Sequence, residues 1–268
     1  LSRTIVAEYR EQGYQIYHYH RKIRTGYKGG ALREGLRKAR GEFIAIFDAD
    51  FIPDKEVLTT LVPFFLENKR LGMIQTRWGH LNPGYSPLTK AQSIIIDSHF
   101  IVEQTARSGN NLFFNFNGTA GIWRKECIID AGNWQDDTLT EDCDLSFRAA
   151  LRDWEFTYIN NIVNKAELPV HIAAYKTQQF RWAKGSIQTI KKLGTHIIAS
   201  SASVFKKIEA LLHLTYYSVH PLLLLNILLL IPLILSKEIS GAFHSFFGSS
   251  ASVLSFSALI PLILFTNT

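Results

Sequence analysis

An uncharged apolar run near the C-terminus constrains the fold more than any other feature of this sequence. From Ala210 to Ser236 the chain contains no Asp, Glu, Lys or Arg. A helix crosses the hydrocarbon core of a bilayer with about 20 mostly apolar residues, and this run is longer than that. The run therefore predicts a transmembrane helix over residues 211–235. The alternative is a helix buried in the core of a soluble domain.

A second run, Ile239–Thr268, also contains no Asp, Glu, Lys or Arg. It is long enough to predict a second transmembrane helix, over residues 242–265. The Ser and Gly residues between positions 245 and 257 lower its hydrophobicity, so a buried helix remains the alternative for this run.

A basic segment leads directly into the first apolar run. Between Arg181 and Ala210 there are six Lys or Arg residues and one Glu. The positive-inside rule places such a cluster in the cytosol, so we expect residues 181–210 to be an amphipathic segment at the cytosolic membrane surface. The net charge of +6 could also indicate nucleic-acid binding. We expect no nucleic-acid partner, because no helix-turn-helix or aromatic-interleaved basic pattern accompanies the charge.

The first 180 residues alternate between helix and strand patterns, which is typical of an α/β domain with a doubly wound sheet. The patterns predict helices over residues 1–12, 31–41, 53–69 and 88–108 and from residue 141, and strands over 14–20, 43–47, 72–78, 113–117 and 156–159. The two cysteines form no Cys-x-x-Cys pair, so the sequence indicates neither a zinc site nor a disulfide framework. This domain is expected to face the cytosol together with the basic segment.

Two carboxylates follow the most apolar of these strands. Phe43–Phe47 is five apolar residues long and predicts a strand buried on both faces. Asp48 and Asp50 follow it, and in extended backbone both would point to one side. Ligands of open α/β sheets bind beyond the carboxyl ends of the strands, and paired carboxylates suit Mg²⁺ or Mn²⁺, which in turn suit a diphosphate. The alternative is a surface turn, in which Asp is common.

Two other motifs combine glycine with a polar side chain. Gly29 and Gly30 precede a predicted helix and would let the backbone approach a ligand closely, with Lys28 as a phosphate or ribose contact. Asn117, Gly118 and Thr119 end a predicted strand and offer polar groups at a ligand edge. Each motif has a plain alternative, a turn before a helix for the first and a hairpin turn for the second.

A third acidic cluster, Thr140-Glu141-Asp142, opens a predicted helix. Thr138 and Glu141 have the spacing of a capping box. Acids in a first helical turn are stabilised by the helix dipole, which is the alternative to a role for one of them as a general base.

The last motif is Gln178-Gln179-Phe180-Arg181-Trp182. Its arginine provides a planar fork for phosphate beside an aromatic ring that can stack on a sugar. The alternative is a Trp/Arg pair at a membrane interface.

These motifs in this order resemble the processive, membrane-embedded family-two glycosyltransferases, cellulose synthase and its relatives. The segments from Lys28 to Gly35, Phe47 to Phe51 and Phe116 to Arg124 are most similar to the mannan- and glucan-synthase-like branch. The resemblance covers roughly residues 13–194. It implies a GT-A-type, Rossmann-like nucleotide-sugar domain over residues 1–180 that lacks its first strand, so the chain is expected to be a fragment cut at both ends.

The resemblance also implies roles for individual residues. Asp142 would be the catalytic base, accompanied by Glu141 and Thr140. The donor nucleotide would be bound by Lys28, Asp48, Asp50, Arg181 and Gln178, and Asp50 would hold Mg²⁺ or Mn²⁺. The acceptor would be bound by Asn117, Gly118, Thr119, Gln179 and Trp182.

The activity implied is inverting transfer of a hexose from UDP-glucose or GDP-mannose to a growing β-linked polysaccharide at the membrane. Two alternatives remain open. One is a non-processive transferase acting on a lipid carrier, a class that generally lacks the Gln178–Trp182 motif. The other is a catalytically silent membrane subunit that binds a nucleotide sugar, against which the acid at Asp142 argues.

Overall fold

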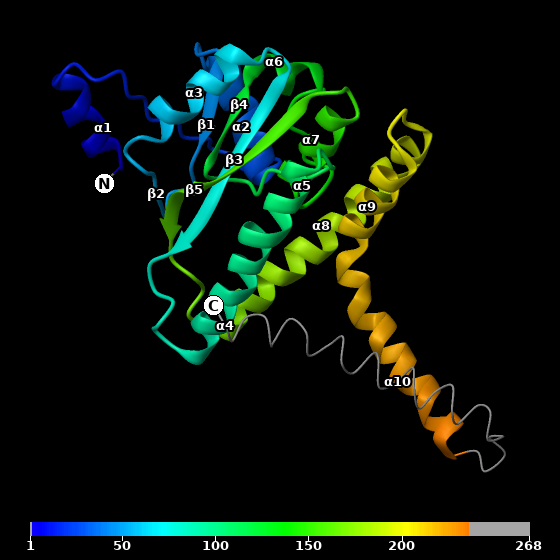
Figure 1. The fold of residues 1–268 in the computed structure, drawn as a ribbon. Coiled ribbons are helices and arrows are strands. Elements are labelled where there is room, and N and C mark those ends of the chain that lie inside the picture. Colours follow the sequence, from blue (N-terminus) through cyan, green and yellow to red (C-terminus); the bar gives the residue numbers. More distant parts are fainter. Residues whose placement is uncertain (1, 236–268) are drawn as a thin grey trace. The chain divides into compact units, whose positions relative to one another are not determined.

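The computed structural model describes residues 2–235 (Figure 1). The chain divides into one compact unit that ends at Tyr216 and a second that begins at Tyr217, and each is described by itself. The predicted second span, residues 242–265, lies outside the described residues.

A five-stranded mixed sheet forms the centre of the first unit, in the order β1-β4-β3-β5-β2. The strands are β1 (Phe43–Ile46), β2 (Phe51–Ile52), β3 (Leu71–His80), β4 (Gly121–Arg124) and β5 (Glu155–Ala166). The two longest, β3 and β5, lie side by side and parallel (Figure 1). The other described pairings are antiparallel, so the α/β class is confirmed but the sheet is mixed.

β1 is an edge strand among the described residues, because only β4 pairs with it. Its Ala45 is exposed, and Ile46 is the one residue of the strand that is fully buried. The prediction of a strand buried on both faces was therefore wrong. An apolar run alone cannot distinguish a central strand from an edge strand that is covered on part of its surface.

Ten α-helices are described, with a π-helix, Ser98–Gln104, between α4 and α5 and a 3₁₀ turn, Tyr216–Ser218, between α9 and α10. The α-helices are α1 (Ser2–Glu11), α2 (Tyr27–Lys38), α3 (Val57–Glu67), α4 (Pro87–Asp97), α5 (Thr105–Gly109), α6 (Lys125–Asp130), α7 (Glu141–Ala150), α8 (Ile172–Ala199), α9 (Val204–Thr215) and α10 (Val219–Leu235).

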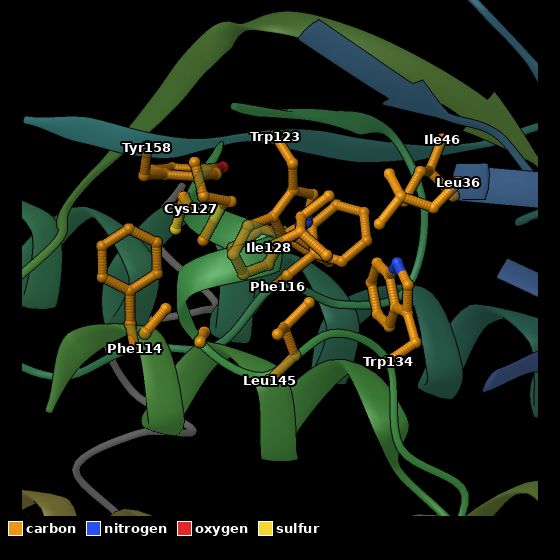
Figure 2. Packing of buried hydrophobic residues seen from close by; sticks show 14 residues of the cluster. Leu36, Ile46, Phe114, Phe116, Trp123, Cys127, Ile128, Trp134, Leu145 and Tyr158 are labelled. Atoms are coloured by element: carbon orange, nitrogen blue, oxygen red, sulfur yellow. The ribbon is translucent and has the colours of Figure 1, made fainter. Parts of the chain in front are cut away.

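Apolar side chains cover both faces of the sheet. On one face Trp123 of β4 makes edge contacts with Phe116 and Trp134, and Ile128 of α6 and Leu145 of α7 belong to the same cluster (Figure 2). On the other face the cluster joins Val57, Leu61 and Phe65 of α3 to Ile74 and Ile122. Full burial of such side chains stabilises the fold by about 1.5–3 kcal/mol each.

A third apolar cluster places the helices that follow the sheet. Phe147 of α7 packs with Leu193 and Ile197 of α8 and with Ala210 and Leu214 of α9. All five are 5% exposed or less. This packing holds the first turn of α7 next to the middle of α8.

Two predicted strands are absent from the described residues. Tyr14–His20 has the alternating pattern but no ladder partner, and Tyr14, Tyr17 and Tyr19 are exposed. Residues 113–117 are not in a strand, although their three phenylalanines are buried. Their backbone N–H groups find side chains instead, since Phe116 N donates to Ser146 Oγ and Asn117 N to Gln75 Oε1.

Helix starts also differ from the sequence pattern. Gly29 and Gly30 lie inside the first turn of α2 rather than before it. The helix expected from Pro53 begins at Val57, after the two-residue strand β2. The long helix predicted over residues 88–108 is present, opened by a capping box of Ser86 and Thr89, but it contains the π-helix.

One helical stretch, Val204–Leu229, is long and apolar enough to cross a membrane by length and composition. It overlaps the span predicted at residues 211–235 and begins seven residues earlier, in the basic segment. This statement covers residues 2–235, the part of the chain that the structure describes.

Candidate active site

A tight turn after residues 113–117 forms the centre of the candidate site. Gly118 has φ +85° and Ala120 φ +58°, so the backbone reverses through two left-handed residues on either side of Thr119. The buried Thr119 Oγ1 accepts a hydrogen bond from Asp48 N at 2.8 Å. This bond ties the turn to the residue that follows β1, although the two are 71 positions apart.

Lys28 of α2 joins the same two segments. Its Nζ lies 2.6 Å from Asp48 Oδ1 and 2.7 Å from Asp48 Oδ2, and it donates to the Gly118 carbonyl at 3.0 Å. Both side chains are partly exposed, at 35% and 40%. The cation and the carboxylate predicted to contact a nucleotide are therefore in contact with each other and with the turn.

Asp142, in the first turn of α7, also lies next to Gly118. A methyl group added at Gly118 would lie 2.9 Å from Asp142 Oδ2 and 3.5 Å from Lys28 Nζ. Only glycine leaves room for this approach at a positive φ. Asp142 Oδ1 accepts a hydrogen bond from Cys143 N at 2.8 Å, which leaves Oδ2 directed at Gly118.

Burial, followed by the neighbouring Glu141, raises the pKa of Asp142 to about 7, against the partial opposition of the Cys143 N–H and Lys28. Burial also raises the pKa of Glu141, while its own backbone N–H, Lys28 and Arg181 oppose that shift. A carboxylate with a pKa near 7 has the protonation behaviour of a general base at neutral pH.

Gly29 and Gly185 allow close approach of the elements around these acids. A methyl group at Gly29 would lie 2.8 Å from the Gln135 carbonyl and 3.2 Å from Glu141 Cβ. One at Gly185 of α8 would collide with the side chain of Thr140, the residue that precedes α7. Gly29 thus serves contact between α2 and α7 rather than the ligand approach expected from the sequence.

One face of α8 continues from this contact towards its N-terminus. Four residues share the face, at spacing i, i+3, i+4 and i+7: Gln178, Arg181, Trp182 and Gly185. Arg181 is exposed and acts electrostatically on Glu141, while Trp182, Gln178 and the adjacent Gln179 are partly buried. The fold therefore brings the glutamine–arginine–tryptophan motif to the same end of α7 as the acids.

Lys192, two turns further along α8, holds the loop before α7. Its Nζ bonds Gln135 Oε1 at 2.6 Å and Asp137 Oδ1 at 2.8 Å, and pairs with the fully buried Asp144 at 2.8 Å. Arg148 pairs with the other oxygen of Asp144 at 2.8 Å. Two cations around a buried carboxylate fix α7 against α8.

A cavity of about 400 Å³ adjoins Lys28. Its lining includes the basic side chains of Arg21 and Arg24 and the aromatic rings of Tyr19 and Tyr27. Guanidinium and ammonium groups suit phosphate oxygens, and aromatic rings suit a planar base.

Asp50 is apart from this cluster. It is exposed in the turn between β1 and β2. In the part of the chain that the structure describes, no group of three or more His, Cys, Asp or Glu could hold a metal alone. Mg²⁺ is usually bound by one or two carboxylates together with substrate phosphates, so the exposed Asp50 fits a cation that binds with a diphosphate.

The Asn117 side chain is engaged by other parts of the protein. Its amide contacts Gln104 and His99 at 2.8 and 3.0 Å. The capping box expected of Thr138 and Glu141 was wrong, because Thr140 is the N-cap and Thr138 Oγ1 is buried without a hydrogen-bond partner among the described residues.

Sequence reasoning missed Gly185, Lys192, Gln104 and His99. Gly185 follows the tryptophan motif by three residues, at the helical spacing that signals a shared face, so its position could have been found. Lys192 was counted only as part of the basic membrane segment. No local sequence pattern indicates which side chains Gln104 and His99 contact.

Comparisons with known proteins identify the family of this chain. Residues 4–185 match the profile described as "Glycosyltransferase like family 2". "Glucomannan 4-beta-mannosyltransferase 1" of Cyamopsis tetragonoloba is 44% identical over 211 residues, 77% of this chain and 39% of that protein. "Probable glucomannan 4-beta-mannosyltransferase 6" of Oryza sativa subsp. japonica is 39% identical over 259 residues, 95% of this chain and 41% of that protein. The chain spans about two-fifths of the length of these relatives.

Two solved structures share the fold. The mannosyltransferase PcManGT from Pyrobaculum calidifontis, in complex with GDP-Man and Mn²⁺, has a TM-score of 0.51 at 16% identity, covering 89% of this chain and 61% of that one. S. aureus TarS 1–349, in complex with UDP, has a TM-score of 0.52 at 15% identity, covering 79% and 56%. They confirm the GT-A-like mixed α/β fold.

Proposed function

This chain belongs to glycosyltransferase-like family 2. We propose that it transfers a hexose from a nucleoside diphosphate sugar to a growing β-linked polysaccharide. The observation that supports this best is the meeting of Lys28, Asp48 and Asp142 at Gly118. A cation suited to a diphosphate and a carboxylate with a base-like pKa thereby lie next to the same glycine.

In the proposed reaction Asp142 accepts the proton of an acceptor hydroxyl as its oxygen attacks the anomeric carbon. The new glycosidic bond forms on the face opposite the leaving group, so the configuration inverts, and the sugar–phosphate bond breaks with its electron pair passing to the diphosphate. Lys28 and Arg181 place positive charge where the leaving diphosphate gains negative charge. Glu141 and Thr140 hold the start of α7, and Gln178 contacts the donor.

A divalent cation bound by Asp50 and the donor phosphates would offset the same developing charge. On the acceptor side, we propose that Trp182 stacks on a sugar ring and that Gln179 and the turn of Asn117, Gly118 and Thr119 complete the subsite.

The names of the relatives favour mannose over glucose as the transferred sugar. Both relatives quoted above are glucomannan 4-β-mannosyltransferases by name, although this chain spans only part of their length. We therefore propose GDP-mannose as the donor and a mannan or glucomannan chain as the acceptor, and UDP-glucose as the second candidate donor.

The proposed organisation is a catalytic domain over residues 1–180, an interfacial segment over 181–210 and transmembrane helices over 211–235 and 242–265. The apolar stretch Val204–Leu229 supports the first helix by length and composition. The basic residues that precede it favour a cytosolic catalytic domain.

A donor panel on the full-length protein in native membranes tests the function. GDP-mannose with Mg²⁺ or Mn²⁺ should give an alkali-insoluble polymer digested by β-mannanase, and EDTA should abolish its formation. A single sugar on an extractable lipid would support the lipid-carrier alternative. Donor binding without release of free nucleoside diphosphate, with every acceptor supplied, would support the silent subunit instead.

A further inference from the structure

Polar side chains contact both ends of the Asn117 amide. Gln104, fully buried, donates through Nε2 to Asn117 Oδ1 at 2.8 Å and to the Asn115 carbonyl at 3.1 Å. On the other end of the amide, Asn117 Nδ2 lies 3.0 Å from His99 Nε2. Its backbone N–H donates to the fully buried Gln75 at 2.8 Å. Asn117 is therefore held on three sides.

The directions of these bonds are mutually consistent. His99 Nδ1 lies 3.1 Å from Glu103 Oε2. Burial raises the pKa of Glu103, but His99 and Arg107 outweigh it and lower this pKa to about 2, so the carboxylate is an acceptor at neutral pH. For the neutral His99 tautomer with its hydrogen on Nδ1, Nε2 accepts from Asn117 Nδ2 while Gln104 donates to Asn117 Oδ1. One orientation of the Asn117 amide then satisfies both Gln104 and His99.

The π-helix explains how two residues five positions apart reach the same side chain. In an α-helix with 3.6 residues per turn, His99 and Gln104 would point about 140° apart. In a π-helix the hydrogen bonds run from i to i+5, so residues five apart lie closer to one face. Both residues belong to the π-helix Ser98–Gln104, and both contact Asn117. The π-helix thus brings both side chains to the turn.

We propose that Gln104 and His99 are positioning residues for the transfer reaction, acting through Asn117 on the Gly118 turn. By fixing Asn117 with its amide turned inward, they hold the Gly118 carbonyl on Lys28 and the Gly118 α-carbon beside Asp142. The side chain of Asn117 then serves the acceptor subsite indirectly. This inference rests on the proposed transferase function.

Gln104→Met tests the proposal, with Gln92→Met as the matched control. Gln92 is another buried glutamine of the same helical run, 2% exposed, and it donates to Leu88 O and Pro169 O instead of the turn. Gln104→Met in the full-length protein should lower kcat at least about tenfold, because it removes the donor that holds Asn117 Oδ1. The donor KM should change less, since Lys28 keeps both contacts to Asp48.

His99→Leu and His99→Gln form a second pair. Leucine removes the acceptor for Asn117 Nδ2, and kcat should fall as in Gln104→Met. Glutamine can present a carbonyl oxygen in place of Nε2 and should restore most of the activity.

Hydrogen exchange adds a readout independent of catalysis. Amides of residues 116–120 should exchange faster in Gln104→Met and His99→Leu than in wild type or Gln92→Met.

Wild-type kcat and unchanged exchange in Gln104→Met would overturn the proposal, and so would equal losses of kcat in Gln104→Met and Gln92→Met. Inactivity of the wild type with every donor would instead contradict the proposed function, and the exchange experiment would still test the positioning of the turn.

Discussion

At the residue scale, the environment of Asp142 links its proposed chemistry to its effect on stability. Burial and Glu141 raise its pKa to about 7, whereas the ordinary value is 3.8. The folded protein therefore binds more protons than the unfolded chain between about pH 4 and pH 7, and this contribution to stability is lost as pH rises through that window. Below pH 7 the protonated acid cannot accept a proton, so kcat/KM should decline there.

Asp142→Asn separates these effects. The amide cannot act as a base, so kcat should fall by about 10²–10⁴-fold while the donor KM stays near wild type. Because the neutral side chain is not penalised by burial when pH rises, the loss of Tm between pH 5 and pH 8 should be smaller than in wild type. Initial rates and thermal unfolding at both pH values measure this.

Asp153→Asn is the matched control, since Asp153 is exposed and its φ of +62° suits asparagine. Its rates and its Tm profile should match wild type. An Asp142→Asn protein with wild-type turnover would exclude Asp142 as the base.

At the element scale, the contact between the start of α7 and the middle of α8 determines whether the acids and the Arg181–Trp182 pair share one site. Gly185 lies against Thr140 with no space for a side chain, and Lys192 holds the loop before α7 from the same helix. A small displacement of α8 would therefore move Arg181 relative to Glu141.

Gly185→Ala should destabilise the protein by about 1–3 kcal/mol and lower kcat, because its methyl group overpacks the contact with Thr140. Gly194→Ala in the same helix meets only Ile190 Cγ1, at 3.4 Å, and should be neutral or stabilising by up to about 1 kcal/mol, as alanine usually is within a helix. Denaturant unfolding and initial rates compare the two. Equal stability of both variants would show that the α7–α8 contact can relax freely.

At the scale of the whole molecule, the apolar stretch Val204–Leu229 begins with charged residues and continues without them. Lys206 and Lys207 stand in its first turn, where long side chains can reach an interfacial region, and Glu209 pairs with Arg107 at 2.7 Å. This arrangement suits a helix that starts at the membrane surface and then enters the bilayer.

The full-length protein should remain in the membrane pellet after washing at alkaline pH, whereas a peripheral protein would be released. Protease added to sealed, cytosolic-side-out vesicles should cleave in the loop of residues 200–203 between α8 and α9, which follows the basic residues of α8. Protection of that segment until detergent is added would contradict the cytosolic orientation.

Local patterns predicted much of the fold and of the candidate site. The run Phe43–Phe47 predicted β1, and the segment after it contains Asp48 in the site. The acids of Thr140–Asp142 predicted the start of α7, and the spacing of Gln178, Arg181 and Trp182 places them on one face of α8. These features depend on residues a few positions apart, so periodicity and helix-start preferences are sufficient to find them.

Contacts between distant segments decided the rest. The mixed sheet, the edge position of β1 and the missing strand at Tyr14–His20 depend on which segments pair, and an alternating pattern does not specify a partner. The inward amide of Asn117 and the π-helix that holds it arise from buried groups that must find hydrogen-bond partners wherever the fold supplies them. Tertiary packing decides which side chains become these partners. Burial excludes water as a partner, so only side chains that packing brings within hydrogen-bond distance remain.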